Sequence, residues 1–203
     1  AAGVKPIIGC EVYVAPRGMS DRVHGIDNDP YHLVLLCKDR TGYENLCYLV
    51  SQAFMEGFYS KPRVDLELLR QRHEGWIATS ACLAGAIPQY LLEEDFASAK
   101  EYALKMADIF GPDNFYLELQ DHGIPEQTPV NQGIMRLARE TGLPLVVTND
   151  AHYLRKEDAR MQDVLLCVQT GKTVDDPNRM KFETEEFYLK SEEELKTLFP
   201  GLE

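Results

Sequence analysis

The sequence lacks several patterns that would assign it at once to a class of protein. No apolar run approaches the roughly 20 residues needed to span a bilayer, and no signal peptide is visible. The G-x-G-x-x-G, P-loop lysine, G-x-S-x-G and H-E-x-x-H motifs are all absent. These absences argue against a membrane protein, a dinucleotide-binding protein, a P-loop hydrolase, an α/β-hydrolase and a zincin.

Paired cysteines are also missing. The five cysteines are scattered along the chain and form no C-x-x-C pair: Cys10, Cys37, Cys47, Cys82 and Cys167. This spacing argues against a zinc ribbon and, without an export signal, against a disulfide framework. We therefore expect the protein to work in a reducing cytoplasm.

Positive charge is scarce. The 203 residues include 21 Lys and Arg against 33 Asp and Glu, which gives a net charge of -12. A chain whose main task was to grip phosphates would usually be basic. Any work on nucleic acid would therefore depend on metal ions or on the charge of a partner.

Strand-like and helix-like segments alternate along the chain. Strands are predicted at residues 5–15, 31–38, 75–81, 114–120 and 143–149, and a short one at 187–189. Helices are predicted at 41–57, 64–74, 86–94, 95–111, 129–142 and 155–171, with a last one after Ser191. Asp65, Asp95 and Ser191 are the expected N-caps, and Glu194 completes a capping box with Ser191. This alternation predicts an α/β fold of parallel strands, either a doubly wound sheet or a barrel.

The stretch PLVVTNDAH ends its apolar run in polar residues. Leu145, Val146 and Val147 are typical of a strand buried on both faces. Asp150 and His152 lie two residues apart, so in an extended segment their side chains project to the same side. They could bind a metal, or Asp150 could cap the helix that follows.

Other polar residues occur at or near the ends of predicted strands, where function is expected in such folds. The candidate set comprises Glu11, His32, Cys82, Asp121, His122, Asp150 and His152. Imidazole, carboxylate and thiolate are ligand types for zinc and similar ions. Each residue also has a structural alternative, such as an exposed strand position for Glu11 or a core role for Cys82. His32 fits poorly at first sight, because it begins its strand instead of ending it.

Several motifs together resemble the PHP (polymerase and histidinol phosphatase) domain. They are GVKPIIGCEVYVAP, YHLVLLCKDRTGYENL, FYSKPRVDLELL, SACLAGAIPQYLL, YLELQDHGIPEQ and LPLVVTNDAHY, in this order over essentially the whole chain. More narrowly, they resemble the version found in the bacterial replicative DNA polymerase III alpha subunit. The combination of KPIIG-E, TGY-NL, KPRVD and TNDAHY is highly specific.

The resemblance implies a distorted (β/α)7 barrel that holds up to three metal ions. By motif, the implied metal ligands are Glu11, His32, Cys82, Asp150 and His152. Asp150 is the expected bridging or water-orienting residue and hence the catalytic one. Zinc or manganese are the expected ions, with magnesium or iron as alternatives. Asp121 and His122 are not among the implied ligands and are interpreted as turn residues.

The His-x-His pair that opens the family's ligand set is absent, and so are the early acidic and histidine ligands. We therefore expect residues 1–203 to be a PHP domain without its first βα units, an incomplete barrel that is inactive alone. Residues from about 175 to 203 are expected to lead towards a polymerase core.

The implied function is a metal-dependent phosphoesterase, a proofreading 3′–5′ exonuclease, within a cytoplasmic bacterial DNA polymerase. Its expected partners are DNA, the polymerase core, a proofreading exonuclease subunit and other replisome proteins, with no membrane. The alternative is a non-catalytic platform that stabilises the polymerase core and docks the proofreading subunit. A free-standing phosphatase is a third, weaker hypothesis. Lys61 and Arg63 could touch DNA phosphates or a neighbouring domain, or could lie in a solvated turn.

Overall fold

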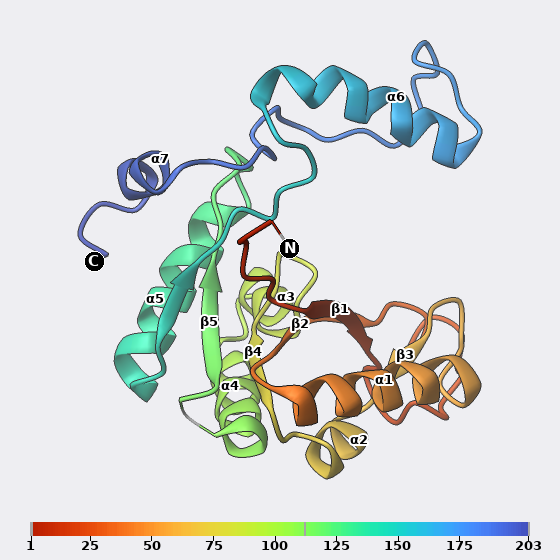
Figure 1. The fold of residues 1–203 in the computed structure, drawn as a ribbon, viewed down its shortest axis with the longest axis vertical. Coiled ribbons are helices and arrows are strands. Elements are labelled where there is room, and N and C mark those ends of the chain that lie inside the picture. The colour runs from red at the N-terminus through yellow and green to blue at the C-terminus, as the bar shows by residue number, and fades with distance from the viewer. Residues whose placement is uncertain (1, 112, 203) are drawn as a thin grey trace. The chain divides into compact units, whose positions relative to one another are not determined.

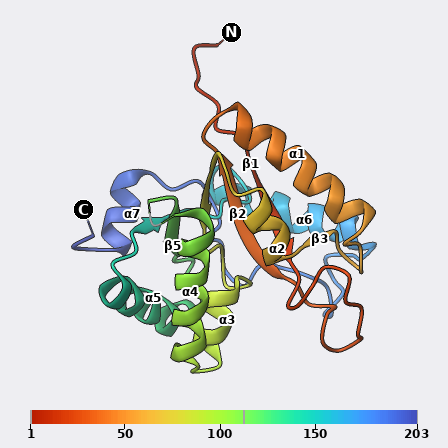
Figure 2. The same cartoon turned by 90° about the horizontal axis from the view of Figure 1, so that it is seen from below.

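The structure, a computed structural model, describes residues 2–111 and 113–202. The chain divides into two compact units, which are described here one at a time. Unit 1 comprises Ala1–Glu118 and Gln132–Val146, and unit 2 comprises Leu119–Asn131 and Val147–Glu203. Figures 1 and 2 show the elements of each unit. No helix in the described part of the chain is long and apolar enough to cross a membrane.

An open six-stranded sheet organises the fold, with the strand order β3-β1-β2-β4-β5-β6. The strands are β1 (Gly9–Val14), β2 (Tyr31–Cys37), β3 (Arg63–Val64), β4 (Trp76–Thr79), β5 (Phe115–Leu119) and β6 (Leu145–Val147). The predicted α/β class is confirmed, and the unclosed sheet is consistent with part of a (β/α) barrel. The prediction that Leu145, Val146 and Val147 are buried on both faces is wrong, since all three are half-buried. Among the described residues their strand is last in the order and has a neighbouring strand on one side.

The prediction of parallel strands throughout is wrong at β2. Strand β1 runs parallel to β3, and β4 runs parallel to β5, but β2 is antiparallel to both β1 and β4. The reason lies in residues 15–30, which form a polar loop without a helix between β1 and β2. Without a crossover helix the chain returns beside the strand it has just left, and this return produces an antiparallel pair.

The helices follow the sequence prediction closely. They are α1 (Arg40–Met55), α2 (Leu66–Gln71), α3 (Ala86–Leu92), α4 (Phe96–Phe110), α5 (Gln127–Thr141), α6 (Ala159–Thr170) and α7 (Glu192–Leu198), with a 3-10 turn η1 (Lys156–Asp158). The predicted caps are confirmed: Asp65 accepts from the Leu68 amide and Asp95 from the Ser98 amide. Ser191 and Glu194 form the expected capping box. The predicted strand at 187–189 is wrong, because Tyr188 makes a single isolated bridge with Tyr153.

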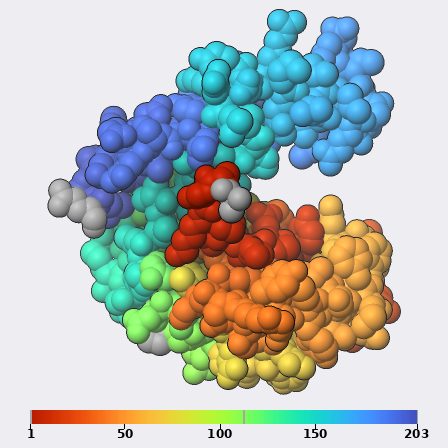
Figure 3. Space-filling model, in the orientation of Figure 1, coloured from red at the N-terminus to blue at the C-terminus, as the bar shows by residue number. Residues whose placement is uncertain are grey.

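The core of unit 1 lies between the sheet and its helices. Its most deeply buried side chains, each at most 1% exposed, include Trp76, Leu35, Leu49 and Phe115. Helices α3 and α4 pack side by side, and α1 packs on β2 and β3 (Figure 2). The outer face of α1, orange in Figure 3, lies at the surface of unit 1. Phe54 on this helix is 58% exposed.

Arg63 organises the loop of residues 15–30 and is completely buried. Its guanidinium donates hydrogen bonds to the backbone carbonyls of Gly57, Asp27, Met19 and Asp21, at 2.8 to 3.1 Å. The hypothesis that Arg63 touches DNA phosphates is therefore wrong, because its guanidinium is buried and bonded to four backbone carbonyls. A buried guanidinium needs several acceptors, and an irregular loop offers the free carbonyls that a strand or helix would not.

Candidate functional site

Three of the predicted ligands meet in unit 1. Tyr13 on β1 lies opposite His32 on β2 in the sheet register, so Glu11, two residues from Tyr13, shares a sheet face with His32. The Glu11 Oε1 atom is 2.6 Å from His32 Nδ1. The Cys82 Sγ atom is 3.5 Å from the same ring nitrogen. We call Glu11, His32 and Cys82 the unit 1 trio.

The antiparallel direction of β2 explains why a residue at the start of a strand joins this site. The first residues of β2 lie at the edge where its antiparallel neighbours β1 and β4 end. The loop after β4 carries Cys82, and the His32 amide donates a 3.0 Å hydrogen bond to Ala84 in this loop. Ala81 has the left-handed φ of +61°, which turns the chain sharply towards His32.

The unit 1 trio forms a small electrostatic cluster. The Cys82 side chain and then the Glu11 carboxylate raise the pKa of His32 to about 10. The Tyr13 ring packs edge-on against the imidazole, with ring centroids 5.2 Å apart. Glu11 and His32 are 44% and 24% exposed, so an ion from solvent can reach them.

The other two predicted ligands lie together in unit 2. The Asp150 Oδ1 atom is 3.6 Å from His152 Nε2. Asp150 has a φ of +42°, a left-handed conformation that is uncommon outside glycine. The alternative role for Asp150 as an N-cap is wrong, because α6 begins after Asp158 and η1 intervenes. We call residues 149–152 the Asp150 turn.

The prediction that Asp121 and His122 are both turn residues is incomplete for His122. Asp121 does act in a turn, where its side chain accepts from the Gly123 amide. The His122 side chain is instead 1% exposed, and its Nε2 atom lies 2.8 Å from the Asn149 carbonyl oxygen. Burial lowers the pKa of His122. The sequence shows a histidine directly after a buried strand, but no periodic pattern distinguishes a buried position in such a turn.

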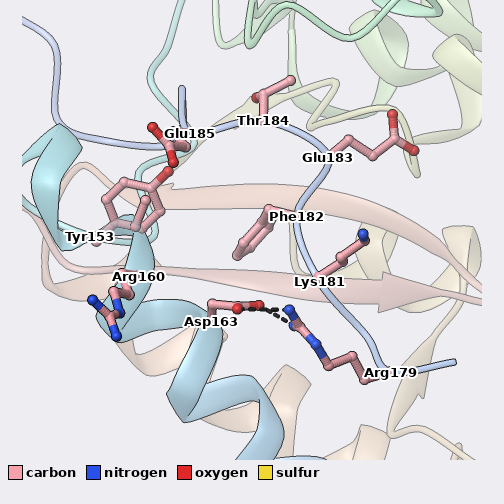
Figure 4. A pocket seen from close by; sticks show the side chains of 10 residues that line it. Tyr153, Arg160, Asp163, Arg179, Lys181, Phe182, Glu183, Thr184 and Glu185 are labelled. Carbon is pink, nitrogen blue, oxygen red and sulfur yellow. Dashed lines mark hydrogen bonds and ion pairs between the residues drawn. The ribbon is translucent and has the colours of Figure 1, made fainter. Parts of the chain in front are cut away.

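A pocket of about 400 Å³ in unit 2 is lined by residues of α6 and of the segment 179–185, together with Tyr153. Figure 4 shows the Phe182 ring between Tyr153 and Lys181, and the ion pair of Asp163 with Arg179 below it. The Phe182 ring also packs on the His152 ring, with centroids 4.7 Å apart. Arg179 donates to both carboxylate oxygens of Asp163 and thus fastens the segment before Phe182 to α6.

The donor types fit a divalent metal, although the arrangement is not a finished metal site. Among residues 2–111 and 113–202, no group of three His, Cys, Asp or Glu side chains is arranged so that it could hold a metal ion. In the unit 1 trio, Glu11 and Cys82 both approach one ring nitrogen of His32. Carboxylate, thiolate and imidazole are the donors that zinc, manganese and iron accept.

Comparisons with known proteins show which family the chain belongs to. The sequence pattern of the PHP domain matches residues 1–122. The chain is 52% identical over 201 residues to DNA polymerase III subunit alpha of Treponema pallidum, which covers 98% of this chain and 17% of that protein. It is 49% identical over 205 residues to the Thermus aquaticus subunit, covering 100% of this chain and 17% of that protein.

The subunit of Borreliella burgdorferi is 46% identical over 202 residues, which cover 99% of this chain and 18% of that protein. The chain thus spans less than a fifth of the length of these relatives. The similarity nevertheless extends over its whole length, and the PHP pattern covers more than half of it. The chain belongs to the PHP domain family.

Proposed function

We propose that this chain is the PHP portion of a bacterial replicative DNA polymerase III alpha subunit and serves as a metal-dependent phosphoesterase. Its substrate would be the 3′ end of a DNA strand, and its reaction a proofreading 3′–5′ exonuclease step. The observation that carries the proposal is the meeting of Glu11 and Cys82 at one nitrogen of His32. A structural core would gain nothing from three potential metal donors in partial contact with solvent.

Each residue has a definite part in this proposal. In unit 1 the trio would hold metal through its imidazole, carboxylate and thiolate, and in unit 2 Asp150 and His152 are the proposed ligands. Asp150 could also accept a hydrogen bond from a water molecule and orient it towards a phosphodiester. Divalent ions, zinc or manganese by donor type, would supply Lewis-acid activation of water and neutralise charge on the phosphate.

The acidic composition supports a role for metal ions in this reaction. With a net charge of -12 the chain repels the phosphates of DNA unless cations or a basic partner intervene. We propose the polymerase core of the same protein and other replisome proteins as partners, and a cytoplasmic location. Residues from about 175 to 203 would lead towards the polymerase core.

A second candidate function is a platform for protein contacts, including a separate proofreading subunit. It is favoured by α6, where Met161, Leu165 and Val168 are 63%, 58% and 74% exposed. These residues follow helical spacing and form one apolar stripe, which is typical of a contact surface. The two functions are compatible, but a pure platform would not need the metal ligands.

The test is a 3′-nuclease assay on single-stranded DNA with the full-length protein and its Asp150→Ala variant. We expect cleavage that requires added Mn²⁺ or Zn²⁺ and falls at least about a hundredfold in the variant, since a metal ligand and its charge are lost. Asp175→Ala removes an exposed carboxylate of the same unit and serves as the matched control.

Metal content and polymerase activity would be measured on the same samples. If both proteins are folded and metal-loaded yet equally inactive as nucleases, the catalytic proposal is wrong. The platform would then be the better description of the domain.

A further inference from the structure

We propose that His122 is a positioning residue for the metal site. Its ring hydrogen bond to the Asn149 carbonyl holds the Asp150 turn in the conformation in which Asp150 and His152 can present their side chains to a divalent cation. This inference rests on the proposed function in treating Asp150 and His152 as metal ligands. His122 itself is not among the predicted ligands, and its buried ring does not need to touch metal or substrate.

The hydrogen bonds around His122 determine which ring nitrogen carries the proton. The Asn149 carbonyl can only accept, so His122 Nε2 must donate to it across 2.8 Å. The other nitrogen, Nδ1, lies 2.8 Å from the Gln127 amide nitrogen, which can only donate. The orientation of the Gln127 amide is itself fixed, because its Oε1 accepts from the His122 backbone N–H at 2.7 Å. His122 is therefore a neutral imidazole with one defined tautomer.

The Asp150 turn is held on both sides. On one side, the Asn149 side chain bonds both the amide and the carbonyl of Lys190 at 3.1 Å, and His122 holds the Asn149 carbonyl. On the other side, the His152 amide donates a 2.8 Å hydrogen bond to the Phe187 carbonyl. Between these anchors Asp150 keeps its left-handed backbone, a conformation that persists where the surroundings impose it.

Phe187 connects the rings of His122 and His152. The Phe187 ring stacks on His122 with centroids 4.1 Å apart and planes 6° from parallel. It meets the His152 ring edge-on at 5.7 Å. The Thr184 hydroxyl donates a 2.6 Å hydrogen bond to the His122 carbonyl. This bond attaches the segment that carries Phe187 to the backbone of His122. A displacement of the His122 ring would thus reach His152 through a single intervening side chain.

Simple packing is a poor explanation for His122. A phenylalanine at this position would stack on Phe187 without the free-energy cost of burying two polar ring nitrogens. The structure instead has an imidazole with both ring nitrogens hydrogen-bonded, one of them to the residue before Asp150. Partners of this kind, which orient a ligand without binding the metal, typically change metal affinity by about 10- to 100-fold.

The test compares two substitutions of His122 in the full-length protein by titration with Mn²⁺. The Asp150→Ala variant identifies the Mn²⁺ bound at this site, because that binding is lost in it. His122→Phe keeps the stacking ring but cannot donate to Asn149, so we expect affinity at this site to fall about 10- to 100-fold. His122→Gln places an amide donor near the position of Nε2, and we expect it to restore most of the affinity.

Two further variants complete the design. His73→Phe is the matched control, since His73 also bonds a backbone carbonyl, that of Arg70 at 2.8 Å, but is exposed in unit 1. It should leave Mn²⁺ affinity unchanged. Gln127→Leu removes the partner of Nδ1 and should weaken Mn²⁺ binding by a smaller factor. This variant decides the matter if His122→Phe does not fold.

The outcomes separate this inference from the proposed function. If Asp150→Ala loses Mn²⁺ while the folded His122→Phe and Gln127→Leu variants bind it like the unsubstituted protein, the positioning role is wrong and the metal site stands. An equal loss of Mn²⁺ affinity in His122→Phe and His122→Gln would also overturn the positioning role. The hydrogen-bond donor to the Asn149 carbonyl would then make no difference. If the unsubstituted protein and Asp150→Ala bind Mn²⁺ equally, the proposed function fails and this inference fails with it.

Discussion

At the scale of single residues, the most informative side chains are polar groups whose burial the sequence does not reveal. Asp27 lies in a loop of polar residues, yet its side chain is completely buried. Arg17 donates to both of its oxygens, at 3.0 and 2.5 Å, and the Val23 amide donates at 2.7 Å. Together with Arg63, this network orders a loop that composition alone describes as an exposed excursion.

The Asp27 network predicts a loss of stability in acid. Arg17 first, and then the Val23 amide, lower the pKa of Asp27 from 3.8 to about 2. Because the folded state favours the charged form, the stabilisation is complete above pH 3.8 and disappears as the pH falls towards 2. We therefore expect Asp27→Asn to lower the melting temperature near neutral pH, and the difference to vanish as the pH approaches 2.

Thermal unfolding followed by circular dichroism at several pH values would measure this effect. Asp29→Asn, an exposed carboxylate in the same loop, is the control and should change the melting temperature little. A gap between Asp27→Asn and the unsubstituted protein that stays constant down to pH 2 would contradict the explanation.

At the scale of elements, the sequence predicts the caps and the apolar spacing of the helices. It does not predict how the helices pack on the rest of the fold. Gly42 in the first turn of α1 illustrates this. A Cβ atom at Gly42 would lie 2.0 Å from the Gly75 carbonyl oxygen, in the turn before β4. The Trp76 indole donates to the Gly42 carbonyl at 2.7 Å. The glycine therefore permits a helix and a turn that are distant in sequence to touch.

This contact predicts that Gly42→Ala destabilises the protein, despite the better helix propensity of alanine. The clash is with backbone, which cannot rotate away, so we expect the free energy of unfolding to fall by about 1 to 3 kcal/mol. Gly133→Ala in α5 is the matched control, because the atoms nearest to a Cβ there belong to the flexible side chain of Leu91 and not to backbone. Urea unfolding of the two variants would compare them, and equal stability would show that α1 shifts at little cost.

At the scale of the whole molecule, the buried apolar side chains are divided unequally between the two units. Those in unit 2 are few among the described residues: Leu119, Val130, Leu166, Cys167, Phe187 and Phe199. Unit 1 contains the central strands with Trp76, Leu35 and Phe115 at its core. Unit 2 instead depends on polar contacts, such as those of His122 and Asn149.

This division predicts that unit 2 opens more readily than unit 1. Segments with few buried apolar contacts undergo local unfolding at lower free energy. Native-state hydrogen exchange with mass spectrometry should therefore show faster exchange in α6 and α7 than in α4 and β4. Binding of Mn²⁺ should slow exchange around Asp150, if that turn holds metal as proposed. Equal protection of α6 and α4 would contradict the prediction.

The sequence by itself determined the local structure and the family. Apolar spacing and capping residues such as Asp65 and Ser191 located the helices, because these signals act within a few residues. The motifs around Glu11, His32, Cys82, Asp150 and His152 indicated the PHP family, since each is a short contiguous run.

Only the tertiary structure decided the direction of β2, the meeting of the unit 1 trio and the burial of Arg63 and His122. Each of these depends on contacts between residues far apart in the chain. Cys82 lies 50 positions from His32, and Thr184 lies 62 positions from His122. No local pattern contains such a pairing, because it arises only when sheet order and loop path bring the two segments together.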